Sequence, residues 1–256
     1  MTIKAHAKVN IFLKITGHQD GYHTLLSRFV RVENLYDTIT FEAGEFEQFT
    51  IEGCDGVDRK INTIYQAFIA LNRYLNNPIL IHFFMNHKVV VSKQIPTQAG
   101  LGGGSSDAAA FMRLVNEVCK LDIDTETLAA IGSEVGADLP FFIYNYPSAN
   151  VKGFGEIVTP FDEEPLSLEL HTPDIACDTT VVYKVFKKYL LERIDPASFF
   201  GWENLDSRTL LNTIVDPVVI NDLYPAAMVA YPEIEKLNKK GWFFSGSGST
   251  FFRLST

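Results

Sequence analysis

A glycine-rich segment near the middle of the chain limits the possible folds more than any other feature. Four of the five residues from 100 to 104 are glycine, and two serines follow them. Glycine tolerates positive φ angles and lets the backbone approach a ligand closely. A valine-rich strand is predicted over residues 88–92, before the loop, and a helix with one apolar stripe over 108–121, after it. We therefore expect a folded loop that leads into the N-terminus of a helix.

This loop is predicted to bind phosphate. Ser105 and Ser106 are expected at the N-cap, so that the N–H groups of the first turn and the positive end of the helix dipole face an anion. No lysine follows the glycines, as G-x-x-x-x-G-K-[S/T] requires, and Ser105 replaces the third glycine of G-x-G-x-x-G. Both of those motifs are therefore excluded. The alternative is a flexible Gly/Ser linker or a simple capping turn, which the flanking strand and helix disfavour.

Composition narrows the class of protein. The chain has 256 residues, of which 46% are hydrophobic and 21% charged, as in folded globular proteins. Its formal net charge of −9 would repel a nucleic-acid backbone, and no apolar run approaches the ~20 residues of a membrane span. We therefore expect neither nucleic acid nor a membrane as a partner. The charged first residues do not form a secretory signal, and three widely spaced cysteines without C-x-x-C predict free thiols in a reducing cytoplasm.

The rest of the sequence mixes strands and helices without a regular βαβ rhythm. Residues 3–15 alternate and predict a half-buried strand, followed by a turn at 17–21, and an acidic break at 162–165 is the best candidate for a linker. This mixture predicts an α+β fold with two subdomains, residues 1–162 and 163–256. Further strands are predicted over 25–35, 38–42, 79–84, 141–144, 166–171, 242–245 and 250–254, and further helices over 61–75, 125–135, 181–192, 210–214 and 217–231.

Two pairs of residues could carry chemistry on residue type alone. Asp138 lies on a constrained turn before Pro140, where a carboxylate could act as a base, and Lys8, on the polar face of the first strand, could favour its ionised form. Tyr22 and His23 follow a glycine and could stack on a base and hydrogen-bond its edge. The structural alternatives are a turn aspartate, a solvated strand lysine and an exposed turn, and the residues alone do not exclude them.

The segment from Pro96 to Asp107, followed by two alanines, resembles the phosphate loop of the GHMP kinases. Residues 7–13 with 20–23, then 136–142, then 245–250 resemble further motifs of the family in the same order. The resemblance spans nearly the whole chain. It implies the two-subdomain GHMP kinase fold, with a ribosomal-protein-like, ATP-binding N-terminal domain over 1–162 and a ferredoxin-like substrate domain over 163–256.

The resemblance also implies a role for individual residues. Lys8 and Asp138 match the catalytic pair of the family. Tyr22 and His23 would hold a cytosine base with Tyr183 as the second aromatic wall, and Asn10 would lie near the substrate phosphates or the reacting hydroxyl. The remaining substrate-binding residues would be Gly246 and Ser247. The ATP-binding residues would be Pro96, Thr97, Gln98, Ala99, Gly100, Leu101, Gly102, Gly103, Gly104, Ser105 and Ser106, with Asn62 and Lys93 near adenine and ribose.

The expected activity follows from these roles. ATP would be the phosphoryl donor, and Mg²⁺ is inferred from ATP chemistry, with Ser106 as a possible ligand. The Tyr22–His23 motif favours the branch of the family that phosphorylates the 2-hydroxyl of a cytidine-diphosphate-linked methylerythritol in non-mevalonate isoprenoid synthesis. The alternatives are a homoserine-type or mevalonate-type GHMP kinase and a non-catalytic nucleotide-binding module. The six histidines show no zinc-binding spacing.

Overall fold

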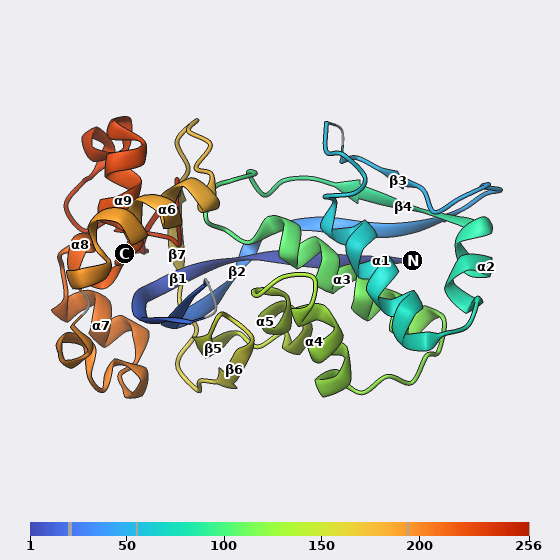
Figure 1. The fold of residues 1–256 in the computed structure, drawn as a ribbon, viewed down its shortest axis with the longest axis horizontal. Helices are drawn as coiled ribbons and strands as arrows, with labels where there is room; N and C mark the ends of the chain where they lie inside the picture. Colours follow the sequence, from blue (N-terminus) through green and yellow to red (C-terminus); the bar gives the residue numbers. More distant parts are fainter. Residues whose placement is uncertain (20–21, 55, 194, 256) are drawn as a thin grey trace. The chain divides into compact units, whose positions relative to one another are not determined.

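The structure, a computed structural model, describes residues 1–19, 22–54, 56–193 and 195–255, without the side chains of Tyr22 and Arg193. The chain forms two compact units. Unit 1 comprises Met1–Ala7, Glu33–Ile95 and Gly102–Tyr146, and unit 2 comprises Lys8–Val32, Pro96–Leu101 and Pro147–Thr256. Two long strands, β1 (Thr2–Gln19) and β2 (Tyr22–Ala43), drawn in blue in Figure 1, contribute residues to both units. The predicted boundary after residue 162 falls inside unit 2, and the assignment of ATP and substrate to separate domains stays a prediction.

The described residues of unit 1 form a small sheet and five helices. The end of β2 pairs antiparallel with β4 (His87–Ser92), and β3 (Ile51–Glu52) pairs parallel with β4. Aromatic rings form much of its core, and Phe49 stacks on Phe68 with 4.0 Å between the ring centroids. The helices are α1 (Thr63–Leu75), α2 (Ile79–Met85), α3 (Gly103–Val118), α4 (Thr125–Ser133) and α5 (Leu139–Tyr144).

Two strands predicted in unit 1 are wrong, because both segments are helices. In α2, the buried residues Leu80 and Phe84 are four apart and share one helical face, which the run of β-formers conceals in the sequence. In α5, Pro140 stands in the first turn, a favourable place for proline. The strands predicted at 25–35 and 38–42 are one continuous strand, β2.

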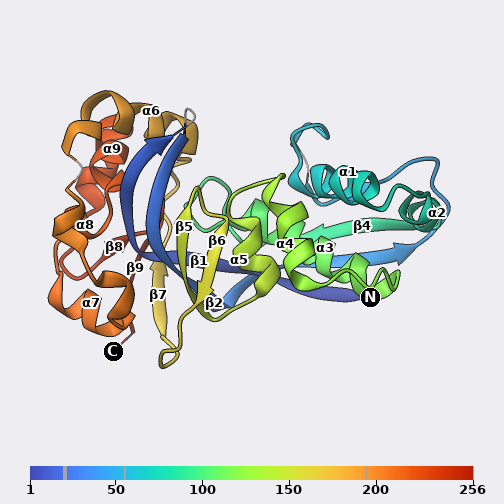
Figure 2. The ribbon, with the colours of Figure 1, turned by 60° about the horizontal axis from the view of Figure 1, so that its bottom comes forward.

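Unit 2 contains a hairpin layer and a second sheet. The first part of β2 pairs with β5 (Ser148–Gly153), which pairs with β6 (Ile157–Pro160). The second sheet has the order β7 (Leu168–His171), β9 (Phe251–Leu254), β8 (Phe243–Phe244). Figure 2 shows α6 (Thr179–Tyr189), α7 (Ser207–Thr213), α8 (Pro217–Ile220) and α9 (Leu223–Ala230), in orange to red, in the same unit. Four short 3₁₀ helices cover Leu191–Arg193, Pro196–Phe199, Trp202–Asn204 and Pro232–Leu237.

The helix predicted over 217–231 is interrupted at Asn221, so it forms α8 and α9 instead. The buried side chain of Asn221 donates to the carbonyl oxygens of Phe244 and Gly246 and accepts from the Leu223 backbone N–H. These bonds are available only if the helix stops there. The α+β class is confirmed.

The acidic segment predicted as a linker is anchored in unit 2. The carboxylate of Glu163 accepts hydrogen bonds from Ser148 Oγ at 2.6 Å and Ser207 Oγ at 2.8 Å, and it lies 3.9 Å from the guanidinium of Arg28. Arg28 is fully buried and stacks on the Phe161 ring at 3.5 Å. This segment therefore belongs to the core of unit 2 rather than to a loose connection.

The first strand is buried on both faces over most of its length. Lys8, Asn10 and Lys14, expected on a solvated face, are 4%, 2% and 6% exposed. The half-buried prediction is therefore wrong beyond the first residues of the strand, because other segments cover its polar face. The three cysteines are free, as predicted, although only Cys177 is fully buried. Within the described residues, none of the helices has both the length and the apolar character that crossing a bilayer requires.

Candidate active site

The glycine loop leads into α3 as predicted, but the helix begins earlier than residue 108. Gly102 is the N-cap, with φ of 70°, and Ser105 and Ser106 lie in the first turn rather than at the cap. Because Gly102 has no side chain, it cannot accept a hydrogen bond from the first-turn N–H groups. Those groups are therefore suited to a ligand anion.

Neighbouring elements of unit 1 fix the start of α3. Thr63 Oγ1 donates to the Gly104 carbonyl at 2.7 Å, and the buried Ser106 Oγ donates to the His6 carbonyl at 2.7 Å. A Cβ atom at Gly136 would lie 3.8 Å from Ser105 Oγ, so the segment between α4 and α5 lies beside the first turn of α3.

That segment carries Asp138. The residue is half-buried at the N-cap of α5, and the hydrogen bond from the Leu139 N–H to the Gly136 carbonyl, at 3.1 Å, tightens the turn. The sequence correctly predicts a constrained turn here, although it connects two helices. Asp138 belongs to unit 1 and Lys8 to unit 2, so their pairing stays a prediction.

Lys93 occupies a buried ion cluster. Its Nζ donates to Asp107 Oδ2 at 2.6 Å and to Asp37, whose other oxygen accepts from the Ile95 N–H at 2.8 Å. Burial raises the pKa of Asp107 to about 7, although Lys93 opposes this shift. Burial lowers the pKa of Lys93, but the two carboxylates raise it more, so it stays charged. This cluster is not predictable from local sequence, because Asp107 and Asp37 are 14 and 56 residues from Lys93.

Asn62 caps α1. Its Oδ1 accepts from the N–H groups of Ile64 at 2.9 Å and Tyr65 at 3.3 Å. The thiol of Cys54 hydrogen-bonds Asn62 and interacts electrostatically with Lys93, so Asn62 and Lys93 lie in one region of unit 1. Their contact with adenine and ribose stays a prediction.

A buried polar cluster in unit 2 surrounds Lys8 and Asn10. Lys8 Nζ donates to Asn10 Oδ1 at 2.6 Å and lies 4.6 Å from the centroid of the Phe29 ring. Asn10 Nδ2 donates to Ser27 Oγ at 3.0 Å, and its backbone N–H donates to Ser245 Oγ at 3.2 Å. These contacts orient the side chains of Lys8 and Asn10.

The first part of the glycine loop packs on the turn between β8 and β9. Ser245 Oγ donates to the Gly100 carbonyl at 2.9 Å, and the Thr250 N–H donates to the Ala99 carbonyl at 3.1 Å. Gly100 has φ of 73°, and a Cβ atom there would come 2.1 Å from the Ser245 carbonyl oxygen. A Cβ atom at Gly246 would likewise lie close to a neighbour, 3.1 Å from Asn10 Oδ1. The predicted residues Asn10, Gly100 and Gly246 are thus brought together.

An aromatic cluster forms around His23 in unit 2. Its ring centroid lies 5.4 Å from that of Tyr183 and 5.6 Å from that of Phe186, both on α6. The buried Nε2 atom of His23 has no hydrogen-bond partner among the described residues. Burial, His18 and Lys187 lower the pKa of His23, so the ring is neutral at pH 7. Phe186, which shares a helical face with Tyr183, is not among the residues predicted from the sequence. Of the predicted Tyr22–His23 pair, the Tyr22 side chain lies outside the described part of the chain, as do residues 20–21.

Comparisons with known proteins bear on this arrangement. Residues 62–146 match the family model described as the GHMP kinases N terminal domain. A protein of Sulfurovum sp. (strain NBC37-1), named 4-diphosphocytidyl-2-C-methyl-D-erythritol kinase, is 66% identical over 99% of this chain and 98% of its own length. The chain belongs to the GHMP kinase family. It is therefore an ATP-dependent small-molecule kinase.

Other members extend this comparison. A protein of the same name from Sulfurimonas denitrificans is 43% identical to this GHMP kinase over 98% of the chain and 96% of its own length. A crystal structure of 4-(cytidine 5'-diphospho)-2C-methyl-D-erythritol kinase has a TM-score of 0.76 and 28% identity, covering 100% of this chain and 90% of that one. A mevalonate kinase structure, at 14% identity and a TM-score of 0.65, shares the fold.

The described part of this GHMP kinase shows no group of three His, Cys, Asp or Glu residues that could hold a metal ion. Ser106, the predicted ligand, is buried, and its hydroxyl donates to the His6 carbonyl. The residues present therefore fit a resident metal site poorly. A role for Mg²⁺ stays a prediction.

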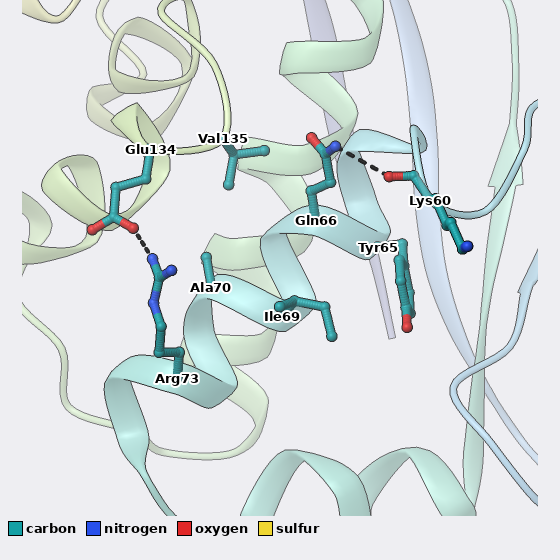
Figure 3. A pocket seen from close by; sticks show the side chains of 8 residues that line it. All are labelled: Lys60, Tyr65, Gln66, Ile69, Ala70, Arg73, Glu134 and Val135. Carbon is teal, nitrogen blue, oxygen red and sulfur yellow. Dashed lines mark hydrogen bonds and ion pairs between the residues drawn. The ribbon is translucent and has the colours of Figure 1, made fainter.

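A separate groove of about 360 Å³ runs along the outer side of α1. Figure 3 shows the ion pair of Arg73 with Glu134 at one end, and the hydrogen bond from the Gln66 amide to the Lys60 carbonyl at the other. Tyr65, which also lines it, packs against Phe68 and Arg59. None of the predicted site residues lines this groove, so it is distinct from the site built above.

Proposed function

We propose that this GHMP kinase transfers the γ-phosphoryl group of ATP to the 2-hydroxyl of 4-(cytidine 5'-diphospho)-2-C-methyl-D-erythritol, giving the 2-phosphate and ADP. The observation that carries the substrate class is the aromatic cluster of His23, Tyr183 and Phe186. An imidazole whose buried Nε2 has no hydrogen-bond partner among the described residues, beside two aromatic rings, suits a flat base with a polar edge. Homoserine and mevalonate contain no such group.

The His23 ring would recognise the edge of the base. A buried polar atom without a partner costs about 1–3 kcal/mol, and a base that pairs with Nε2 would remove this cost. Because its pKa is lowered, His23 at pH 7 offers one donor and one acceptor nitrogen. A site of this kind discriminates strongly against ligands that lack the matching groups.

The glycine loop would hold the donor. The uncapped first turn of α3 would bind the ATP phosphates, with Asn62 and Lys93 toward adenine and ribose. Mg²⁺ would enter with ATP as part of the substrate and balance the phosphate charge. Ser105, which is half-buried, is better placed than the buried Ser106 to approach that ion.

The chemical step would use Asp138 and Lys8. Asp138 would accept the proton of the reacting hydroxyl, and the Lys8 ammonium, fixed by Asn10, would stabilise the charge on the transferring phosphoryl group. Asn10 would orient the hydroxyl or a substrate phosphate. No membrane or nucleic acid takes part in this reaction, and we propose a cytoplasmic location for it.

A turnover assay tests the proposal. The purified protein is incubated with ATP, Mg²⁺ and the cytidine substrate; ADP is measured by a coupled assay and the product by ³¹P NMR. We expect ADP and a new phosphomonoester in equal amounts. Turnover only with homoserine or mevalonate would instead assign another branch of the family. ATP binding in calorimetry without turnover on any of the three acceptors would indicate a non-catalytic nucleotide-binding module.

A further inference from the structure

We infer that His18 is a positioning residue for base recognition, because its imidazole contacts the His23 ring from β1 while α6 contacts that ring through Tyr183 and Phe186. The inference rests on the proposed function, in which His23 reads the cytosine edge. His18 itself would not contact the base. It is absent from the motifs that point to the substrate, and only the structure places it beside them.

The geometry encloses His23 from two elements. His18, near the end of β1, meets the His23 ring edge-on, with 5.0 Å between centroids and 77° between planes. Tyr183 and Phe186 face it from α6, at interplanar angles of 32° and 84°. Phe186 is 3% exposed and is therefore held by the core of unit 2. Among the described residues, His18 thus contacts the His23 ring from β1, while Tyr183 and Phe186 contact it from α6.

Charge acts in the same direction as packing. Among the described residues, the groups that face His23 are His18 from β1 and Lys187, Tyr183 and Phe186 from α6. Burial lowers the pKa of His23 most, followed by His18 and then Lys187. A doubly protonated imidazole can only donate hydrogen bonds, so it could not accept one from the base edge. His18 and Lys187 thus favour the neutral, recognising form of His23.

His18 and Lys187 differ in how they act. Lys187 is exposed, so its effect is electrostatic and is weakened by salt. His18 is exposed as well, but its ring also meets the His23 ring edge-on, and salt does not screen that contact. Removing His18 should therefore raise the pKa of His23 even at high ionic strength.

The test compares His18→Ala and His18→Gln with the natural protein from pH 5.5 to 8.5, at saturating ATP and 0.5 M salt. We expect kcat at pH 8 and the KM for ATP to change less than twofold. Below pH 6.5, the KM for the cytidine substrate should rise more steeply as the pH falls than in the natural protein. The extra rise approaches about threefold to tenfold at the acid end, the limit for a shift of half to one pKa unit. The His23 ring proton, followed by NMR, should titrate at higher pH in both variants. The matched control is His82→Gln, an exposed histidine of α2, which should change neither profile.

Two results would overturn the inference. One is an unchanged His23 titration in both variants. The other is a lower kcat together with a higher KM at every pH, which indicates a structural role. The NMR titration needs no substrate. If the natural protein fails to bind cytidine 5'-diphosphate in calorimetry while His23 still shifts in the variants, the proposed substrate is wrong and only the effect of His18 on His23 remains.

Discussion

At the scale of single residues, every buried cation on the first strand has a defined partner. Lys8 contacts Asn10 and Phe29, and Lys14 pairs with Asp222 and also bonds the Val219 carbonyl at 2.9 Å. Burying an ammonium group without such partners would cost several kcal/mol. One side of the strand therefore makes buried polar contacts. On that side, Lys8 and Asn10 have a proposed chemical role and Lys14 does not.

The first prediction concerns Asp138. The change Asp138→Asn keeps the size of the side chain but removes its ability to accept a proton. We expect kcat to fall about 10²-fold to 10⁴-fold, while the ATP dissociation constant changes less than twofold, because the phosphate loop is untouched. Steady-state kinetics and calorimetry measure the two quantities. An equal loss in both would make Asp138 a structural residue.

A second residue-level prediction concerns Asp107. Its pKa of about 7 in the folded state lies above the ~3.9 of an unfolded aspartate, so the folded protein holds an extra proton between these values. The stability that this proton contributes is present below about pH 4 and is lost as pH rises to about 7. Relative to Asp107→Asn, the natural protein should lose up to about 1.4 kcal/mol per pH unit in this range and nothing further above it. Urea unfolding from pH 5 to 8.5 measures this difference; a constant difference would contradict it.

At the scale of elements, the long amphipathic helices were predictable and the short ones were not. Thr63–Leu75 and Thr125–Ser133 carry clear caps, Asn62 and Asp124, and apolar spacing. The segments of α2 and α5 contain only 7 and 6 residues, too few to show a helical period, and their many β-formers favour strands locally. Tertiary packing decides such segments.

The candidate site likewise has a part that the sequence predicts and a part that it does not. The glycine loop is a local pattern and could be found from the sequence alone. The Lys93 cluster, the Asn10–Ser245 contact and the His23–Phe186 contact join residues that are 14 to 235 positions apart. Such contacts leave no periodic signal, so only the structure reveals them.

The loop also supports a prediction about glycine. Gly100 and Gly241 have φ of 73° and 80°, so alanine at either position would cost about 1 kcal/mol in backbone strain. At Gly241, no described atom lies within 4 Å of the added Cβ, whereas at Gly100 it would meet the Ser245 carbonyl at 2.1 Å. We expect Gly100→Ala to destabilise by at least about 3 kcal/mol and Gly241→Ala by about 1. Chemical denaturation compares them, and equal losses would exclude the steric argument.

At the scale of the whole molecule, neither compact unit is a continuous piece of chain. Fragment 163–256 lacks Lys14 and Arg28, the partners of Asp222 and Glu163, and fragment 1–162 lacks most of unit 2. Removing one partner of a buried ion pair costs about 3–5 kcal/mol, a large part of the stability of a small domain. We therefore expect neither fragment to fold alone. Thermal melts followed by circular dichroism and ¹H–¹⁵N NMR test this, and a cooperative melt with dispersed resonances from either fragment would contradict it.

The alternation of the two units along the chain also restricts what recombination can do to such a gene. Unit 1 and unit 2 alternate along the chain and meet at five junctions, after residues 7, 32, 95, 101 and 146. No single recombination event between two homologous genes can therefore exchange one unit intact while it keeps the other. New acceptor specificity in this lineage would then arise by substitution within clusters such as that of His23, and not by exchange of a ready-made module.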